Sequence, residues 1–75
     1  MKKFVVMESI GTWEKRDGKI IIDCTVKAHL IAFESNDWLE VFNESRKLEY
    51  GRTMDKDGHW HSYSPMKRAA AKRLL

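Results

Sequence analysis

The chain has 75 residues, a formal net charge of +3, 33% charged residues and one cysteine. This length predicts a single domain, 1–75, near the lower limit for a core without disulfides or metals, and one cysteine excludes an intramolecular disulfide. No CxxC or paired Cys/His spacing marks a structural zinc site, so we expect a compact domain that depends on hydrophobic packing.

The charge is unevenly distributed along the chain. Residues 1–57 carry ten Lys/Arg and eleven Asp/Glu, whereas residues 58–75 carry four Lys/Arg and no acidic residue. Such segregation favours a polyanion or an acidic protein surface as partner. The apolar run from Phe4 to Met7 is interrupted by Glu8 and is too short for a signal peptide or a membrane span, so we expect a cytoplasmic protein that does not bind membranes.

A long β-hairpin is predicted around Asp17-Gly18, because both central positions of a type I′ turn need positive φ. Pairing Arg16 with Lys19 then sets the register of the two strands. That register places Trp13 opposite Ile22, Gly11 opposite Cys24, Met7 opposite Ala28, Val5 opposite Leu30 and Glu8 opposite Lys27. Near Phe4 both faces are apolar, so a second layer is expected to cover the other face.

The segment Ser35–Leu48 fits either a helix or a strand. Asp37 and Glu40 have the spacing of a capping box, and apolar residues from Trp38 onwards follow helical spacing. In a strand, Trp38, Glu40 and Phe42 would share one side. We favour a short helix.

A second hairpin is predicted from the alternation of Leu48 to Met54, turn residues at 55–58 and a strand over His59–Tyr63. A terminal helix follows, with Ser64 as its N-cap, Pro65 as its first residue and an alanine run behind them. Lys67 and Arg68 would then occupy a first turn that favours anions, which indicates an anion-binding site there.

Together these elements predict a small α+β domain. It has an antiparallel sheet of about four strands in two hairpins, a short middle helix and a C-terminal helix. A small SH3-like barrel with a terminal helix is the alternative.

We expect a non-enzymatic binding protein without cofactor or metal. Phosphate loops, GxSxG and HExxH are absent, and a chain of this length has little room for an enzymatic pocket. His59-x-His61 is the only metal-like spacing, and it lacks a third ligand.

The leading hypothesis is association with nucleic acid, DNA or RNA, through the basic C-terminal helix and the preceding hairpin. The predicted nucleic-acid or anion contacts are Lys67, Arg68, Lys72, Arg73, Arg52, Lys56 and His61. The alternative is a protein-interaction module, such as a phage-type or mobile-element-type inhibitor or adaptor of a larger machine, with Trp38 and Trp60 as anchors. A homodimer is also possible, with Phe4, Val6 and Ile31 at its seam.

Overall fold

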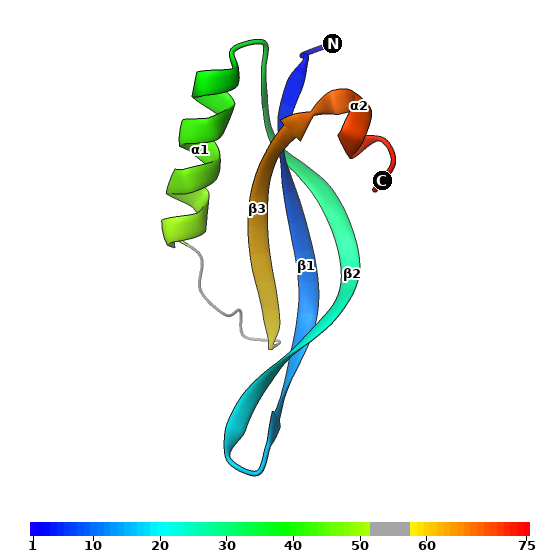
Figure 1. Cartoon of the computed structure of the whole chain (residues 1–75), viewed down its shortest axis with the longest axis vertical. Helices are drawn as coiled ribbons and strands as arrows, with labels where there is room; N and C mark the ends of the chain where they lie inside the picture. Colours follow the sequence, from blue (N-terminus) through cyan, green and yellow to red (C-terminus); the bar gives the residue numbers. More distant parts are fainter. Residues whose placement is uncertain (52–57) are drawn as a thin grey trace.

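The structure is a computed structural model that describes residues 1–51 and 58–75; for residues 13–16 and 20–25 it describes the backbone alone. Along the chain the elements are β1 (Phe4–Arg16), β2 (Lys19–Ser35), α1 (Trp38–Gly51), β3 (His59–Lys67) and α2 (Arg68–Ala71). Within the described residues, an open antiparallel sheet of three strands has the order β2-β1-β3 (Figure 1). The protein is therefore broadly α+β; the described residues contain three strands, and neither the expected sheet of about four strands nor the SH3-like barrel is confirmed.

The hairpin of β1 and β2 is confirmed at its turn and is wrong in register farther away. Asp17 and Gly18 have φ of 50° and 77°, as a type I′ turn requires. Arg16 pairs with Lys19 and Trp13 with Ile22, as expected. Beyond Trp13 the partners change: Gly11 lies opposite Val26, Met7 opposite Ile31, Val5 opposite Glu34 and Glu8 opposite Leu30.

The cause of this difference is three register shifts between the turn and Phe4. β2 has 17 residues where β1 has 13, so extra residues of β2 bulge out of the ladder. Because Val5, Val6 and Met7 are all buried, the apolar pattern of β1 fits several registers. Only the pairing in three dimensions selects one.

The helical interpretation of the middle segment is confirmed, and α1 begins at Trp38. The backbone N–H of Leu39 donates to Asp37 Oδ1 at 3.0 Å, so Asp37 is the N-cap. Ser35 completes the cap, since its Oγ accepts from the N–H of Asp37 at 3.0 Å and donates to Glu40 Oε2 at 3.1 Å.

The first strand of the second hairpin is contradicted by the length of α1. This helix continues to Gly51, so 48–51 are helical, and the remainder of the predicted strand and turn, 52–57, lies outside the described residues. β3 instead pairs with β1, from Thr12↔His59 to Phe4↔Lys67.

The predicted start of the terminal helix is also wrong. Ser64 and Pro65 belong to β3, and α2 begins at Arg68 and has only four residues. Proline fits here because β3 is an edge strand, where a missing N–H need not interrupt the ladder. Pairing of Val5 with Met66, which packs against the core, keeps this segment extended.

The core lies on both faces of β1, the central strand. On one face, Val5, Met7 and Ala71 of α2 are fully or almost fully buried, with Ile31 and Met66 packed against them. On the other face Val6 is fully buried. There the ring of Phe4 packs edge-on against the ring of Trp38 in α1, with 5.4 Å between the ring centroids.

The expected cover over the second face is therefore confirmed, and it is α1. This packing also occupies the seam that the sequence suggested for a homodimer. Phe4 and Val6 lie under α1, and Ile31 packs in the cluster beneath α2.

The outer edge of β3 is covered by side chains of α1, which runs beside it (Figure 1). The N–H of Tyr63 donates to Glu49 Oε2 at 3.0 Å, and the carbonyl of Tyr63 accepts from Ser45 Oγ at 3.2 Å. Two residues farther along the strand, Pro65 has no N–H to offer. From Tyr63 to Pro65 this edge is thus protected from pairing with another strand.

Candidate functional site

The two ends of the chain meet at the start of β1. The backbone N–H of Arg68 donates to the carbonyl of Lys3 at 2.9 Å, and Phe4 pairs with Lys67 in the sheet. The N–H of Lys3 in turn donates to Asn36 Oδ1 at 2.9 Å. These bonds place the N-terminal lysines directly beside the C-terminal cations.

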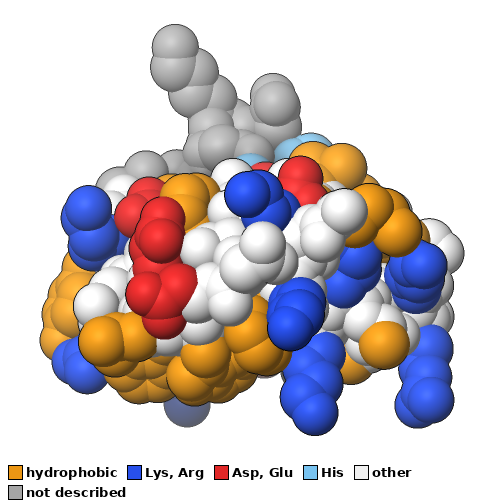
Figure 2. All heavy atoms as spheres, turned by 90° about the horizontal axis from the view of Figure 1, so that it is seen from above, with side chains coloured by type: hydrophobic (Ala, Val, Ile, Leu, Met, Phe, Trp, Pro, Cys, Tyr) orange, Lys and Arg blue, Asp and Glu red, His pale blue; other side chains and the backbone are white. Residues whose placement is uncertain are grey.

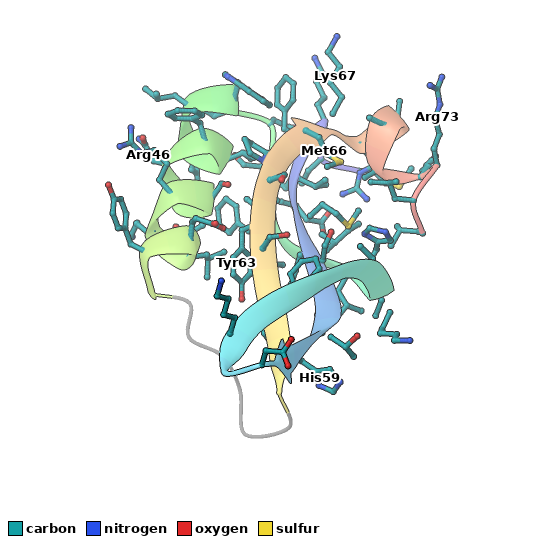
Figure 3. The ribbon with its side chains drawn as sticks, turned by 60° about the horizontal axis from the view of Figure 1, so that its bottom comes forward. Arg46, His59, Tyr63, Met66, Lys67 and Arg73 are labelled. Atoms are coloured by element: carbon teal, nitrogen blue, oxygen red, sulfur yellow. The ribbon has the colours of Figure 1, made fainter. Side chains whose placement is uncertain are left out.

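Five exposed cationic side chains gather at this end of the molecule, which we call the basic end. They are Lys2, Lys3, Lys67, Lys72 and Arg73. Seen from above, Lys and Arg side chains concentrate on the α2 side, while apolar and acidic side chains concentrate over α1 (Figure 2). Lys67 and Arg73 both point away from the sheet at this end (Figure 3).

The two cations that directly follow α2, Lys72 and Arg73, are positioned by the docking of Ala71. The Ala71 side chain is fully buried on the sheet, and the backbone N–H groups of Lys72 and Arg73 are bonded to the carbonyls of Arg68 and Ala70. The neighbouring side chains of Lys72 and Arg73 consequently lie in solvent. The backbone at both residues is thus already ordered, and a partner has to order only the two side chains.

Arg68 differs from the other cations because its charge is already paired. Its guanidinium forms an ion pair with the carboxylate of Glu34, and its Nε donates to the carbonyl of Lys2 at 2.6 Å. The Arg68 side chain is only 17% exposed. The Arg68 side chain therefore connects α2 with Glu34 of β2 and with Lys2 of the N-terminal segment. The carboxylate of Glu34 offsets the charge of Arg68.

The predicted helix start at Ser64-Pro65, which would have placed Lys67 and Arg68 in the first turn of a longer helix, is wrong, while anion binding by these residues stays a prediction. Lys67 is an extended residue without a side-chain cap bond, and the four residues of α2 cannot provide the N-terminal turn of a long helix. The carboxylate that meets Arg68 belongs to Glu34 of the same chain. What the structure provides instead is a cluster of exposed charges from both ends of the chain.

Of the three remaining predicted contacts, the structure describes only His61, and His61 does not join the basic end. Arg52 and Lys56 lie outside the described residues. His61 lies in β3 six residues before Lys67, about 20 Å away along an extended strand. Its Nδ1 is 3.1 Å from Glu8 Oε2, which also accepts a 2.5 Å hydrogen bond from the Tyr63 hydroxyl.

The two predicted tryptophan anchors have different environments. Trp38 is 44% exposed and stands edge-on to Phe4, the pairing partner of Lys67, so this ring borders the basic end. Trp60 is half-buried across Gly11, and its Nε1–H donates to the carbonyl of Thr12 at 2.9 Å. Trp60 is therefore part of the sheet packing, and Trp38 is the ring available to a partner.

Sequence reasoning missed Lys2, Lys3 and Glu34 as parts of this site. The Lys2-Lys3 pair is visible in the sequence, but no spacing relates it to residues at the other end of the chain. The Glu34–Arg68 pair depends on the shifted register that brings Glu34 opposite Val5.

Searches of protein-family models, curated proteins and solved structures found no match to this chain. In the part of the chain that the structure describes, no helix has the length and apolar character to cross a membrane. Nor do the side chains that the structure describes, those of residues 1–12, 17–19, 26–51 and 58–75, include a group of three or more His, Cys, Asp or Glu in an arrangement suited to a metal ion.

Proposed function

We propose that the protein is a non-enzymatic nucleic-acid-binding protein that uses its basic end. The observation that supports this most is the Lys3–Arg68 backbone bond, because it joins cations from both ends of the chain into one exposed surface. Phosphates are the anions that such a surface meets at regular spacing on a nucleic acid. A cytoplasmic location, as expected from the sequence, suits this partner.

Trp38 extends the proposed surface. Its ring is partly exposed beside Phe4 and therefore close to Lys67. Aromatic rings beside cations bind single strands by stacking on bases while the cations contact phosphates. In our proposal Lys2, Lys3, Lys67, Lys72 and Arg73 contact the backbone, and Trp38 contacts an accessible base.

The test is a binding titration with a short duplex and a single strand of the same sequence, each at two salt concentrations. One variant carries Lys67→Gln, Lys72→Gln and Arg73→Gln. Its control carries Lys19→Gln, Lys27→Gln and Lys47→Gln, three exposed lysines elsewhere, so both variants lose the same charge.

The first variant should lose binding, with the slope of log K against log salt reduced by about one for each phosphate contact removed. The control should retain most of the affinity. Binding that is absent at low salt, or that falls equally in both variants, contradicts the proposal.

A second candidate function is a protein-interaction module in which the same basic end meets an acidic protein surface. The partial exposure of Trp38 beside the cations supports it, because tryptophan is a frequent anchor of protein interfaces. A pull-down from nuclease-treated lysate separates the two. A stoichiometric protein partner that depends on Lys67, Lys72 and Arg73 favours the interaction module, and loss of every partner favours nucleic acid.

A further inference from the structure

Trp38 lies close to two cations of the basic end. Its ring packs edge-on against Phe4, and Lys67 pairs directly with Phe4 in the sheet. Directly opposite residues of an antiparallel pair share one face, with Cβ atoms about 5 Å apart. The N–H of Lys3 also donates to Asn36 Oδ1 at 2.9 Å, two residues before Trp38. Two exposed lysines, from opposite ends of the chain, are therefore held beside the partly exposed ring of Trp38.

The charge of the surface changes sign at Trp38. Asp37 and Glu40 are exposed on the α1 side of the ring, and no Lys or Arg occurs from 36 to 45. Both carboxylates bond to uncharged donors, the N–H of Leu39 and the hydroxyl of Ser35. Figure 2 shows the same division, with Lys and Arg side chains on the α2 side and acidic side chains over α1. Trp38 thus stands at the boundary between a cationic and an acidic surface.

This boundary suits one nucleic-acid backbone and opposes a second. Charge alone would favour a duplex, which carries one negative charge per about 1.7 Å of its axis, twice the density of one strand. However, phosphates of a second strand beyond Trp38 would approach the carboxylates of Asp37 and Glu40. A single strand has one line of phosphates for the lysines, and its unpaired bases can stack on an aromatic ring.

Given the nucleic-acid binding proposed above, on which this step rests, we propose that the basic end prefers single-stranded to double-stranded nucleic acid. One backbone lies along Lys3 and Lys67, and an unpaired base stacks on Trp38. The carboxylates of Asp37 and Glu40 repel a second backbone. The partner class is a flexible strand with accessible bases, a chemistry that single-stranded DNA and RNA share.

The first experiment is a titration of the full chain with a short single strand, its duplex and an abasic strand of the same length, all at one salt concentration. The single strand, used as DNA and as RNA, should bind several-fold more tightly than the other two in at least one of these forms. Trp38→Leu should weaken binding of that strand roughly fivefold or more, because a stacked base is lost, and should leave the abasic strand unaffected.

Two further variants control for the loss of the Trp38 ring. Trp38→Phe keeps an aromatic face and should restore most of the single-strand affinity. Tyr50→Leu removes an aromatic ring that is 83% exposed at the other end of α1, and should leave that affinity unchanged. Circular dichroism shows whether each variant is folded.

A second pair of variants tests the repulsion of the second strand. Asp37→Asn with Glu40→Gln removes two charges beside Trp38 and keeps an oxygen acceptor in each side chain. Duplex affinity should rise several-fold more than single-strand affinity. Asp17→Asn with Glu44→Gln is the control, because it changes the net charge equally and asparagine suits the turn. This control should change both affinities in the same proportion.

Three results overturn the single-strand preference and leave nucleic-acid binding standing. They are tighter binding of the duplex by the wild type, a single-strand affinity that Trp38→Leu does not change, and equal responses of the two acidic pairs. Absence of binding to every strand at low salt overturns both proposals. The two failures are therefore distinguishable in one set of titrations.

Discussion

Lys3 and Arg68 are joined by a backbone hydrogen bond of 2.9 Å, which holds the first residues of the chain against the start of α2. The side chain of Arg68 adds a second link through the carbonyl of Lys2. The exposed N-terminal lysines and the C-terminal cations are consequently parts of one surface. The first two predictions test this relationship.

Replacing the N-terminal lysines should weaken nucleic-acid binding about as much as replacing the last cations of the chain. Lys2→Gln with Lys3→Gln and Lys72→Gln with Arg73→Gln each remove two exposed charges from the basic end. Each pair should reduce the slope of log K against log salt by about two if all four cations contact phosphates. A titration in which the N-terminal pair behaves like wild type shows that these lysines lie outside the interface.

Glu34→Gln should strengthen nucleic-acid binding. This carboxylate pairs with the Arg68 guanidinium, and its removal leaves that charge uncompensated at the basic end. Glu34 is 45% exposed but the Arg68 side chain only 17%, so loss of the pair should cost more stability than the roughly 0–1 kcal/mol of a fully exposed pair. Glu44→Gln, which makes the same change of charge on α1, is the control for overall charge. Equal affinities of Glu34→Gln and Glu44→Gln for nucleic acid would contradict the view that Glu34 offsets the charge of Arg68 at the basic end.

Gly11→Ala should destabilise the fold, since the indole of Trp60 lies across Gly11. A Cβ at this position would come within 2.3 Å of Trp60 Cζ2, and the ring is held by its bond to the Thr12 carbonyl. Displacing the ring should lower the free energy of unfolding by about 1–3 kcal/mol.

Gly51→Ala is the matched control for that substitution. A Cβ at Gly51, the last residue of α1, would meet no atom within 4 Å, so alanine should be neutral or stabilising by about 0.4–1 kcal/mol. Urea unfolding of both variants measures the difference. Equal stabilities would show that Trp60 does not occupy the space above Gly11.

Glu49→Ala should cost about 1–3 kcal/mol in the free energy of unfolding, because the Tyr63 N–H on the edge of β3 loses its acceptor. Glu49→Gln should cost less, because an amide oxygen can still accept this bond. Glu44→Ala removes a partly exposed carboxylate whose ion pair with the exposed Lys47 is weak, so it should change stability by less than about 1 kcal/mol. If thermal melts give Glu49→Ala and Glu49→Gln the same stability, the hydrogen bond from Tyr63 to Glu49 does not stabilise the edge of β3.

Local chemistry explains which features of the fold were predicted correctly. The turn at Asp17-Gly18 needs two positive φ angles, and the N-cap at Asp37 needs an acceptor for the N–H of Leu39. Both requirements are met by residues next to one another in the sequence. The prediction of a helix from Trp38 was correct for the same reason.

The wrong predictions concern segments whose local preference is overridden by distant partners. Ser64-Pro65 carries the signature of a helix start, yet it pairs with Met7 and Val6 in the sheet. Leu48 to Gly51 alternates like a strand, yet it completes α1, where Glu49 reaches the edge of β3. In both places tertiary contacts contribute more than intrinsic propensity does.

The sequence by itself determined the hairpin turn, the helix cap and the excess of cations after Asp57, because each depends on neighbouring residues or on composition. Only the tertiary structure decided the register of β2, the strand conformation of Pro65, and the meeting of Lys2 and Lys3 with Lys67. These features arise from hydrogen bonds and packing between residues far apart in the chain. Their energies depend on the whole arrangement, so no short stretch of sequence specifies them.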